Sequence, residues 1–186
     1  MVRIIAGSAR GRKIETLEGL ETRPTLDRVK EAMFGSLQFR IPYAKVLDLF
    51  AGSGSLGLEA ASRGAKRVVW NDRNPACVEI IRRNIAALGF SEIAGTMNLD
   101  YTAAIDRLSS AGEAFDMAFL DPPYREGLSE DAVKRLFVSH LILPGGVVVL
   151  EHAAALAPKD EPGIYRIVRT KRFGKCGYSL IEEDGI

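Results

Sequence analysis

The sequence predicts a single α/β domain with a mostly parallel, seven-stranded sheet, and three observations support this fold class. Short apolar runs alternate with helical segments between residues 45 and 151, and repeats of strand, helix and strand build parallel sheets with helices on both faces. A glycine-rich turn joins the first strand of the series to its first helix. The last two strand-like segments follow each other without a helix, which predicts an antiparallel pair at one edge of the sheet.

Residues 1–40 precede the alternating region and predict a small extension made of a β-hairpin and a helix. Strand-like residues 3–6 and 13–15 flank a turn that contains Gly7 and Gly11. The helix covers residues 26–38, where apolar side chains recur at helical spacing. Arg23 and Thr25 lie at its start, and two roles stay open for them: capping the helix or covering a bound cofactor.

The remaining elements follow in order from apolar spacing and from the residues that end each segment. The expected strands are residues 45–50, 67–71, 95–99, 115–120, 146–151, 165–171 and 178–183, and the expected helices are residues 55–63, 75–88, 101–110 and 130–141. The second of these helices has the clearest boundaries, because Pro75 suits a first helical turn and Gly89 suits the position after the last. Residues 41–186 therefore form the core of the domain.

Composition narrows the class of protein. At 186 residues and 47% hydrophobic content, the chain can bury a full core. No apolar run reaches the roughly 18 residues of a membrane span, and the N-terminus lacks the apolar region of a signal peptide. Cys77 and Cys176 are too few for a metal cluster or a disulfide framework. We therefore expect a cytoplasmic protein without membrane contact or metal, in which Cys77 and Trp70 pack in the core.

The net charge of +1 hides an uneven distribution. Residues 1–13 and 164–178 contain nine of the 25 Lys and Arg residues and no acid, so the remainder holds 16 bases against 24 acids. Basic segments on an acidic body indicate contact with a polyanion such as nucleic acid, although Lys and Arg also guard exposed edge strands against aggregation. The predicted nucleic-acid contacts are Arg3, Arg10, Arg12, Lys13, Arg172 and Lys175.

Residues 46–57 combine a strand, a glycine turn and the start of a helix. Gly52, Gly54 and Gly57 match the pattern G-x-G-x-x-G, which allows a tight turn and close approach of a ligand to the backbone. A tight strand-to-helix turn without a ligand is the alternative for this pattern alone. Asp48 adds a negative charge beside the turn, and this charge favours a cationic ligand such as S-adenosylmethionine over a dinucleotide, whose pyrophosphate needs the helix N-terminus.

Two further acids end the next two expected strands. Asp72 lies 20 residues after Gly52, where an acid can bind both hydroxyls of a ribose. Asp100 ends the third strand, where it could accept the amino group of an adenine. Because open α/β sheets bind ligands at strand ends, these acids predict a nucleoside-containing ligand.

The motif Asp121-Pro122-Pro123-Tyr124 follows an apolar strand. Two prolines cannot continue a central strand because they lack the N–H group that the ladder needs. The chain therefore leaves the sheet and presents an acid, a free carbonyl and an aromatic ring together. That set suits a flat base with an exocyclic amine, since the ring can stack on the base while the carboxylate and the Pro122 carbonyl accept the amine hydrogens. A plain turn is the alternative for the motif alone.

The glycine motif of residues 48–54 and the Asp-Pro-Pro-Tyr motif together resemble the amino-group methyltransferases that use S-adenosylmethionine. The motifs of residues 3–7, 11–13, 23–34 and 174–179 narrow the resemblance to the RsmD family, over nearly the whole chain. It implies a Rossmann-like class I methyltransferase fold. It also implies methylation of the N2 amine of a guanine in 16S rRNA, either as free small-subunit rRNA or in an assembly intermediate. We expect the protein to be a monomer.

The resemblance also implies roles for the matching positions. The expected catalytic residues are Asp121, Pro122 and Tyr124, and the expected cofactor site comprises Asp48, Phe50, Gly52, Gly54, Asp72, Asp100 and Tyr101. The family has Val-Glu where this chain has Asn71-Asp72, and we expect the shorter acid still to reach the ribose.

Three other functions stay open at the level of sequence. An amine methyltransferase that acts on adenine N6 in DNA or RNA would use the same Asp-Pro-Pro-Tyr motif. An RNA-binding assembly factor could retain the fold without activity. A nicotinamide-dependent reductase is disfavoured, because no tyrosine of this chain is followed four residues later by a lysine.

Overall fold

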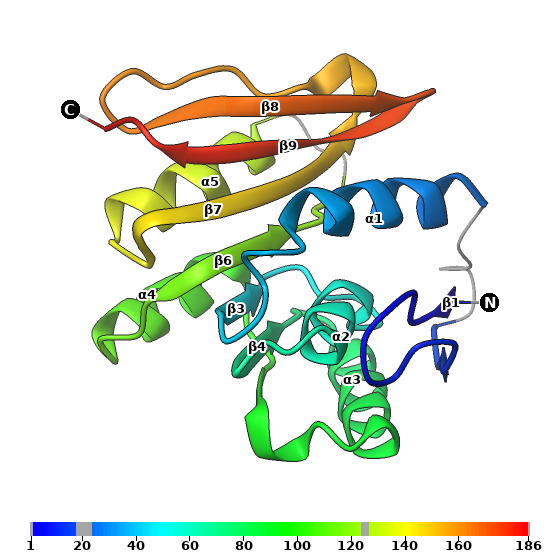
Figure 1. The fold of residues 1–186 in the computed structure, drawn as a ribbon. Coiled ribbons are helices and arrows are strands. Elements are labelled where there is room, and N and C mark those ends of the chain that lie inside the picture. The colour runs from blue at the N-terminus through cyan, green and yellow to red at the C-terminus, as the bar shows by residue number, and fades with distance from the viewer. Residues whose placement is uncertain (1, 18–23, 124–126, 186) are drawn as a thin grey trace.

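The computed structural model describes residues 2–17, 24–123 and 127–185, apart from the side chains of residues 24–27. A seven-stranded sheet forms the centre of the protein, and helices cover both of its faces (Figure 1). An antiparallel hairpin of β1 (Val2–Arg3) and β2 (Lys13–Ile14) lies beside the sheet. The predicted fold class is confirmed, including the N-terminal hairpin.

The central sheet has the strand order β5-β4-β3-β6-β7-β9-β8. The five strands from β5 to β7 in this order run parallel, whereas β9 runs antiparallel to both of its neighbours. The bounds are β3 (Lys45–Asp48), β4 (Arg67–Asn71), β5 (Ala94–Met97), β6 (Phe115–Leu120), β7 (Ile142–Ala153), β8 (Tyr165–Phe173) and β9 (Cys176–Glu183). The order reverses between β3 and β6, and the carboxyl ends of strands at such a switch point are where open α/β sheets bind ligands.

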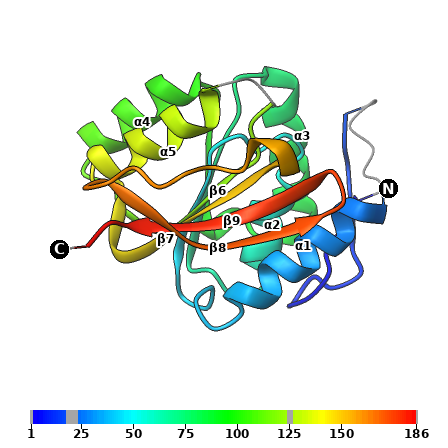
Figure 2. The ribbon, with the colours of Figure 1, turned by 90° about the horizontal axis from the view of Figure 1, so that it is seen from above.

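The helices divide between the two faces according to their apolar side chains. One face carries α1 (Pro24–Leu37), α2 (Ser55–Ser62) and α3 (Pro75–Leu88), and the other carries α4 (Tyr101–Ser110) and α5 (Leu128–Val138). Figure 2 shows α1 and the α4–α5 pair on opposite sides of β7 and β9. Successive strand residues alternate between the two cores: Val46 and Phe119 face α1, whereas Leu47 and Ala118 face α4 and α5. None of the helices in the described ranges is long and apolar enough to cross a membrane.

Most element boundaries lie within two residues of their predicted positions, and β7 is the main exception. It begins at Ile142, which pairs with Phe115 before a register shift, and it ends at Ala153, which pairs with Cys176 of β9. Both extensions depend on partner strands that the local sequence does not reveal. Two short 3-10 helices, Ser91–Ile93 and Ala154–Leu156, have no counterpart in the prediction.

The N-terminal hairpin is fastened to the sheet through a buried carboxylate. Glu59 of α2 is fully buried, and it accepts the N–H groups of Ile5 and Ala6 at 2.8 and 3.0 Å. The same carboxylate pairs with Lys30 of α1 and Arg63 at 3.2 and 2.8 Å. Three apolar hairpin residues belong to the core on this face: Val2, Ile4 and Ile14. The hairpin and the sheet therefore share one core.

Candidate active site

Four carboxyl side chains lie at the carboxyl ends of four neighbouring strands. They are Asp72 after β4, Asp48 at the end of β3, Asp121 after β6 and Glu151 near the end of β7. The residue two positions before each of them belongs to the core on the α1 side: Trp70, Val46, Phe119 and Val149. Strand alternation therefore turns all four toward that side. We call this set the acidic row, and it crosses the switch point of the sheet.

Asp48 is the most deeply buried member of the acidic row, with 1% of its surface exposed. Its Oδ2 accepts the N–H of Gly57 at 2.9 Å, and its Oδ1 is buried without a hydrogen-bond partner among the described residues. Burial raises the pKa of this carboxyl to about 7, and the charges of Asp121 and Asp72 add to the effect. A buried carboxylate oxygen without a partner is costly, so this atom suits a cationic ligand.

The glycine turn between β3 and α2 packs on Trp70. A Cβ atom at Gly57 would overlap the indole nitrogen Nε1, which donates a hydrogen bond to the Gly54 carbonyl at 3.2 Å. Gly54 has a φ of 82°, a left-handed conformation that favours glycine. Gly52 also has a positive φ, but a Cβ there would stand in open space. The indole thus supports the turn from below, while the Gly52 side stays open for a ligand.

Asp72 and Asn71 hold the ends of three strands in place. Asp72 accepts the N–H groups of Gly52 and Asn74, each at 2.8 Å. The fully buried Asn71 amide donates to the carbonyls of Leu49 and Leu99, both at 3.1 Å. A carboxylate has about four acceptor positions, so Asp72 can still accept two ribose hydroxyls. Asn71 was absent from the predicted site; a polar residue at the end of an apolar strand was its only signal.

An aromatic pair lies beside the third acid of the predicted cofactor site. Asp100 is exposed and caps α4, since its Oδ1 accepts the N–H of Thr102 at 3.0 Å. The rings of Phe50 and Tyr101 contact each other with centroids 5.5 Å apart. The Tyr101 hydroxyl donates to Asp131 of α5 at 2.7 Å, which fixes the ring. These residues offer a flat ligand an apolar wall with a carboxylate at its end.

Asp121 follows β6 as the sequence predicts. Its side chain is exposed on one side while protein surrounds the other, and the resulting desolvation raises the pKa of the carboxyl above its usual range. Pro122 is buried. The predicted stacking residue Tyr124 lies outside the described residues.

Glu151 is a second carboxyl beside Asp121, and it lies outside the site that the sequence predicts. Leu120 pairs with Leu150 in the parallel register of β6 and β7, so Asp121 and Glu151 are the next residues on the two strands. Glu151 is 7% exposed, and burial and the charge of Asp121 both raise its pKa. The only hint in the sequence was an acid within a strongly apolar strand.

The residues of the acidic row fit S-adenosylmethionine. This cofactor carries a cationic methionine part, a ribose and an adenine. The unpartnered Oδ1 of Asp48 suits the cation, and the open side of Gly52 leaves room for the ligand next to the backbone. Asp72 suits the ribose. Among the described residues, no group of three His, Cys, Asp or Glu side chains could hold a metal ion.

The predicted RNA-binding residues come from two segments that lie on one side of the molecule. β8 runs parallel to β7, so the turn after Phe173 lies at the carboxyl end of the sheet, near the acidic row. Figure 1 shows this turn and the N-terminal hairpin on either side of the start of α1. Six exposed bases surround this region: Arg3, Arg10, Arg12, Lys13, Arg172 and Lys175. Arg12 also donates to the Ala87 carbonyl at 2.8 Å, which anchors the hairpin to α3.

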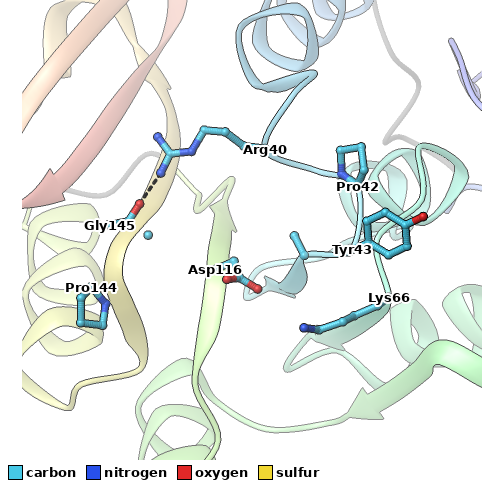
Figure 3. Close-up of a pocket in the computed structure, with 9 residues that line it drawn as sticks. Arg40, Pro42, Tyr43, Lys66, Asp116, Pro144 and Gly145 are labelled. Carbon is cyan, nitrogen blue, oxygen red and sulfur yellow. Dashed lines mark hydrogen bonds between the residues drawn. The ribbon is translucent and has the colours of Figure 1, made fainter.

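A separate cavity of about 280 Å³ lies at the opposite end of the sheet. Its lining includes Tyr43, Lys66 and Asp116, and Arg40 reaches across one side to donate to the Gly145 carbonyl at 2.6 Å (Figure 3). None of the predicted site residues lines this cavity. It is therefore distinct from the acidic row.

Cys77 and Trp70 are buried, as predicted for core residues. His152 lies at the end of β7, where its Nε2 lies 2.9 Å from the Ser179 hydroxyl. Burial lowers the pKa of this histidine.

Comparison with known proteins identifies relatives over almost the full chain. The sequence model of the family described as conserved hypothetical protein 95 matches residues 2–182. Ribosomal RNA small subunit methyltransferase D of Haemophilus influenzae is 35% identical, with 97% of this chain and 93% of that protein covered. The protein of the same name from Escherichia coli is 32% identical over 98% and 90%. The solved structure of Escherichia coli yhhF aligns with a TM-score of 0.86 and 33% identity, covering 100% of this chain and 99% of the other.

Proposed function

Because the chain belongs to the RsmD family, we propose that it transfers a methyl group from S-adenosylmethionine to the N2 amine of a guanine in 16S rRNA. One observation carries the proposal. Asp121 follows its strand directly beside the glycine turn that Asp48 and Asp72 support, so a base held by Asp121 would face a cofactor held at that turn.

The cofactor would be held by residues from the first three parallel strands. We assign the methionine part to Asp48 and the backbone at Gly52 and Gly54, the ribose to Asp72, and the adenine to Asp100 with the Phe50–Tyr101 wall. When bound, S-adenosylmethionine supplies an electrophilic methyl group on a positively charged sulfur. The remaining chemistry falls to the residues that hold the base.

Asp121 and the Pro122 carbonyl would orient the amine. The lone pair of guanine N2 is delocalised into the ring, which makes it a poor nucleophile. Hydrogen bonds from both amine hydrogens to these two acceptors would direct the lone pair toward the methyl group, and correct positioning lowers the barrier. The carboxylate would also stabilise the positive charge that develops on nitrogen. Since desolvation raises its pKa, Asp121 is well suited to receive the proton that the methylated amine releases.

A base can enter such a site only when it is flipped out or unstacked. We assign Tyr124 to stacking on that base, a contact worth about 1–3 kcal/mol. The basic segments on either side of α1 would bind the flanking phosphates. The proposal includes a cytoplasmic monomer that acts on small-subunit rRNA or an assembly intermediate, and size-exclusion chromatography with light scattering tests the monomer.

The decisive experiment compares 16S rRNA from cells with and without the gene. Mass mapping is expected to find one N2-methylguanine in the first sample and an unmodified guanine at the same position in the second. Purified protein with labelled S-adenosylmethionine should then restore the modification to small-subunit particles from the deletion strain. Product with N6-methyladenine would assign a different target, and absence of any labelled product would refute the proposed activity.

A further inference from the structure

We propose that Glu151 selects guanine by accepting the N1–H group of the target base, while Asp121 and the Pro122 carbonyl accept the N2 amine. This inference rests on the proposed function and assigns a role to a residue outside the set that the sequence predicts. It makes Glu151 a specificity-determining residue that touches the substrate.

The first argument is placement. Leu120 and Leu150 are partners in the parallel pair β6–β7, so Asp121 and Glu151 follow at the same level of the sheet. Phe119 and Val149 both lie in the core on the α1 side, and alternation turns the residues two positions later to that side as well. A base amine bound at Asp121 would therefore have the Glu151 carboxyl as its neighbour along the sheet.

The second argument is that no described residue pairs with the Glu151 carboxyl to explain its burial. Glu151 is only 7% exposed, and none of the hydrogen bonds or ion pairs found between described residues involves its carboxyl; its oxygens are not among the fully buried atoms, so a ligand can reach them. Its cross-strand neighbour Tyr178 directs its hydroxyl to α1, where it donates to Ala32 at 3.0 Å and contacts Ser36 at 2.8 Å. The adjacent His152 contacts Ser179 instead. A structural carboxylate at this depth would be paired, as Glu59 is with Lys30 and Arg63.

The third argument is the effect of two like charges side by side. Burial raises the pKa of both Asp121 and Glu151, and the charge of Asp121 raises that of Glu151 further. Two neighbouring carboxyls disfavour each other's ionisation. A ligand edge with several adjacent N–H donors would relieve that repulsion and donate hydrogen bonds to both carboxyls.

Guanine presents such an edge and adenine does not. Its N1–H lies next to the N2 amine, so three hydrogens project on one side of the base. Adenine has an unprotonated N1 that is itself an acceptor, so it donates nothing to an ionised Glu151, whereas the N1–H of guanine favours that ionised form. A site whose buried polar group is left unpaired rejects the wrong ligand strongly. The acidic row thereby offers recognition of guanine as well as methyl transfer.

The experiment separates N1 from N2 by changing the base. The rRNA segment that carries the methylated nucleotide is prepared with guanine or with 2-aminopurine at that position, since 2-aminopurine keeps the 2-amine but has an unprotonated N1. Wild-type protein should methylate the guanine RNA about 10- to 100-fold faster in kcat/KM. Glu151→Gln should slow methylation of guanine and shrink this ratio at least about fivefold, because an amide can donate to the N1 of 2-aminopurine.

Glu183→Gln is the matched control, because Glu183 is exposed at the far end of β9; it should behave as wild type. Thermal unfolding and binding of adenosylhomocysteine confirm that the Glu151 variant is folded. An unchanged ratio in folded Glu151→Gln, or equal rates of the wild-type protein on both RNAs, would overturn the inference and leave the proposed function intact. Failure of the wild-type protein to methylate the guanine RNA would overturn both.

Discussion

A single buried oxygen, Oδ1 of Asp48, shows how the site trades stability for binding. The ordinary pKa of an aspartate is 3.8, whereas burial raises that of Asp48 to about 7. Folding therefore favours the protonated form. The stability that the protonated carboxyl provides is fully present below pH 4. It is lost as the pH rises toward the pKa of Asp48 in the folded protein. Near neutral pH this carboxyl is partly ionised at a cost in stability, and a cationic ligand would offset that cost.

Replacing Asp48 with Asn is expected to stabilise the protein at alkaline pH. The amide oxygen can still accept the Gly57 N–H, but no charge has to be buried. The stability of the variant relative to wild type should rise by about 1–4 kcal/mol between pH 4 and pH 8, as measured by urea unfolding at each pH. Affinity for S-adenosylmethionine should fall in the same variant. A stability difference that does not change with pH would contradict the assigned titration.

Replacing Asp121 with Ala tests the neighbour of Asp48 in the acidic row. Because the side chain is exposed and makes no hydrogen bond to a described residue, the fold and cofactor binding should change little. Turnover should fall by about 100-fold or more, measured with labelled methyl transfer, while calorimetry follows adenosylhomocysteine binding. Asp106→Ala on the exposed side of α4 is the control. Near-normal methylation by Asp121→Ala would remove this residue from the mechanism.

The sequence predicts the acids that precede recognisable motifs, Asp48 and Asp121, but it does not point to Asn71 and Glu151. The difference has a physical cause. A glycine turn or a pair of prolines marks a strand end in the chain itself, so the adjacent acid stands out. Asn71 bonds to a neighbouring strand, and Glu151 lies beside Asp121 only because β6 and β7 pair in space, and a local pattern carries no information about such neighbours.

At the scale of elements, the strand-turn-helix unit of β3 and α2 combines two kinds of glycine. Position 57 requires glycine because Trp70 of β4 occupies the space that a side chain would need, whereas Gly52 borders open space. The pattern G-x-G-x-x-G does not reveal which glycine is required for packing and which borders a ligand. Helix α3, by contrast, has its predicted bounds, because Asn74, Pro75 and Gly89 define its ends locally. Elements whose ends are set by their own residues were predictable, and β7, whose length is set by pairing, was not.

Alanine at these two glycines should separate stability from binding. Gly57→Ala would overlap the indole of Trp70 and should destabilise the protein by about 1–3 kcal/mol, seen as a lower Tm. Gly52→Ala introduces strain at its positive φ of 54° but no overlap, so its main effect should be weaker cofactor binding in calorimetry. If both variants lost cofactor affinity in the same proportion to their loss of stability, the two glycines would not have the separate roles assigned here.

At the scale of the whole molecule, the charged side chains fall into two populations. Every ion pair between described residues uses a base outside the two basic segments: Lys30, Arg40, Lys45, Arg63, Arg67, Arg82, Arg83, Lys134 and Arg135. The bases of the two segments thus remain available for phosphates. β8 is also the edge strand of the sheet, so its bases can protect that edge as well.

Removing charge at the β8–β9 turn should weaken RNA binding in a salt-dependent way. If Arg172 and Lys175 each contact a phosphate, the double alanine variant should make the slope of log RNA association constant against log salt concentration less steep by about 1–2. Filter binding across a salt series measures it. The control is Lys45→Ala with Arg67→Ala, at the opposite end of the sheet and paired with Glu113. An unchanged slope would leave the two bases as surface charge.

The position of β9 has a consequence for how the protein is made. β9 follows β7 and β8 in the chain but inserts between them in the sheet, so the edge of β7 stays unpaired until β9 has been synthesised. Tyr178, which connects β9 to α1, becomes available at the same stage. The sheet can therefore be completed only after β9 has been synthesised, and a chain truncated before Cys176 would lack the strand that joins β7 to β8.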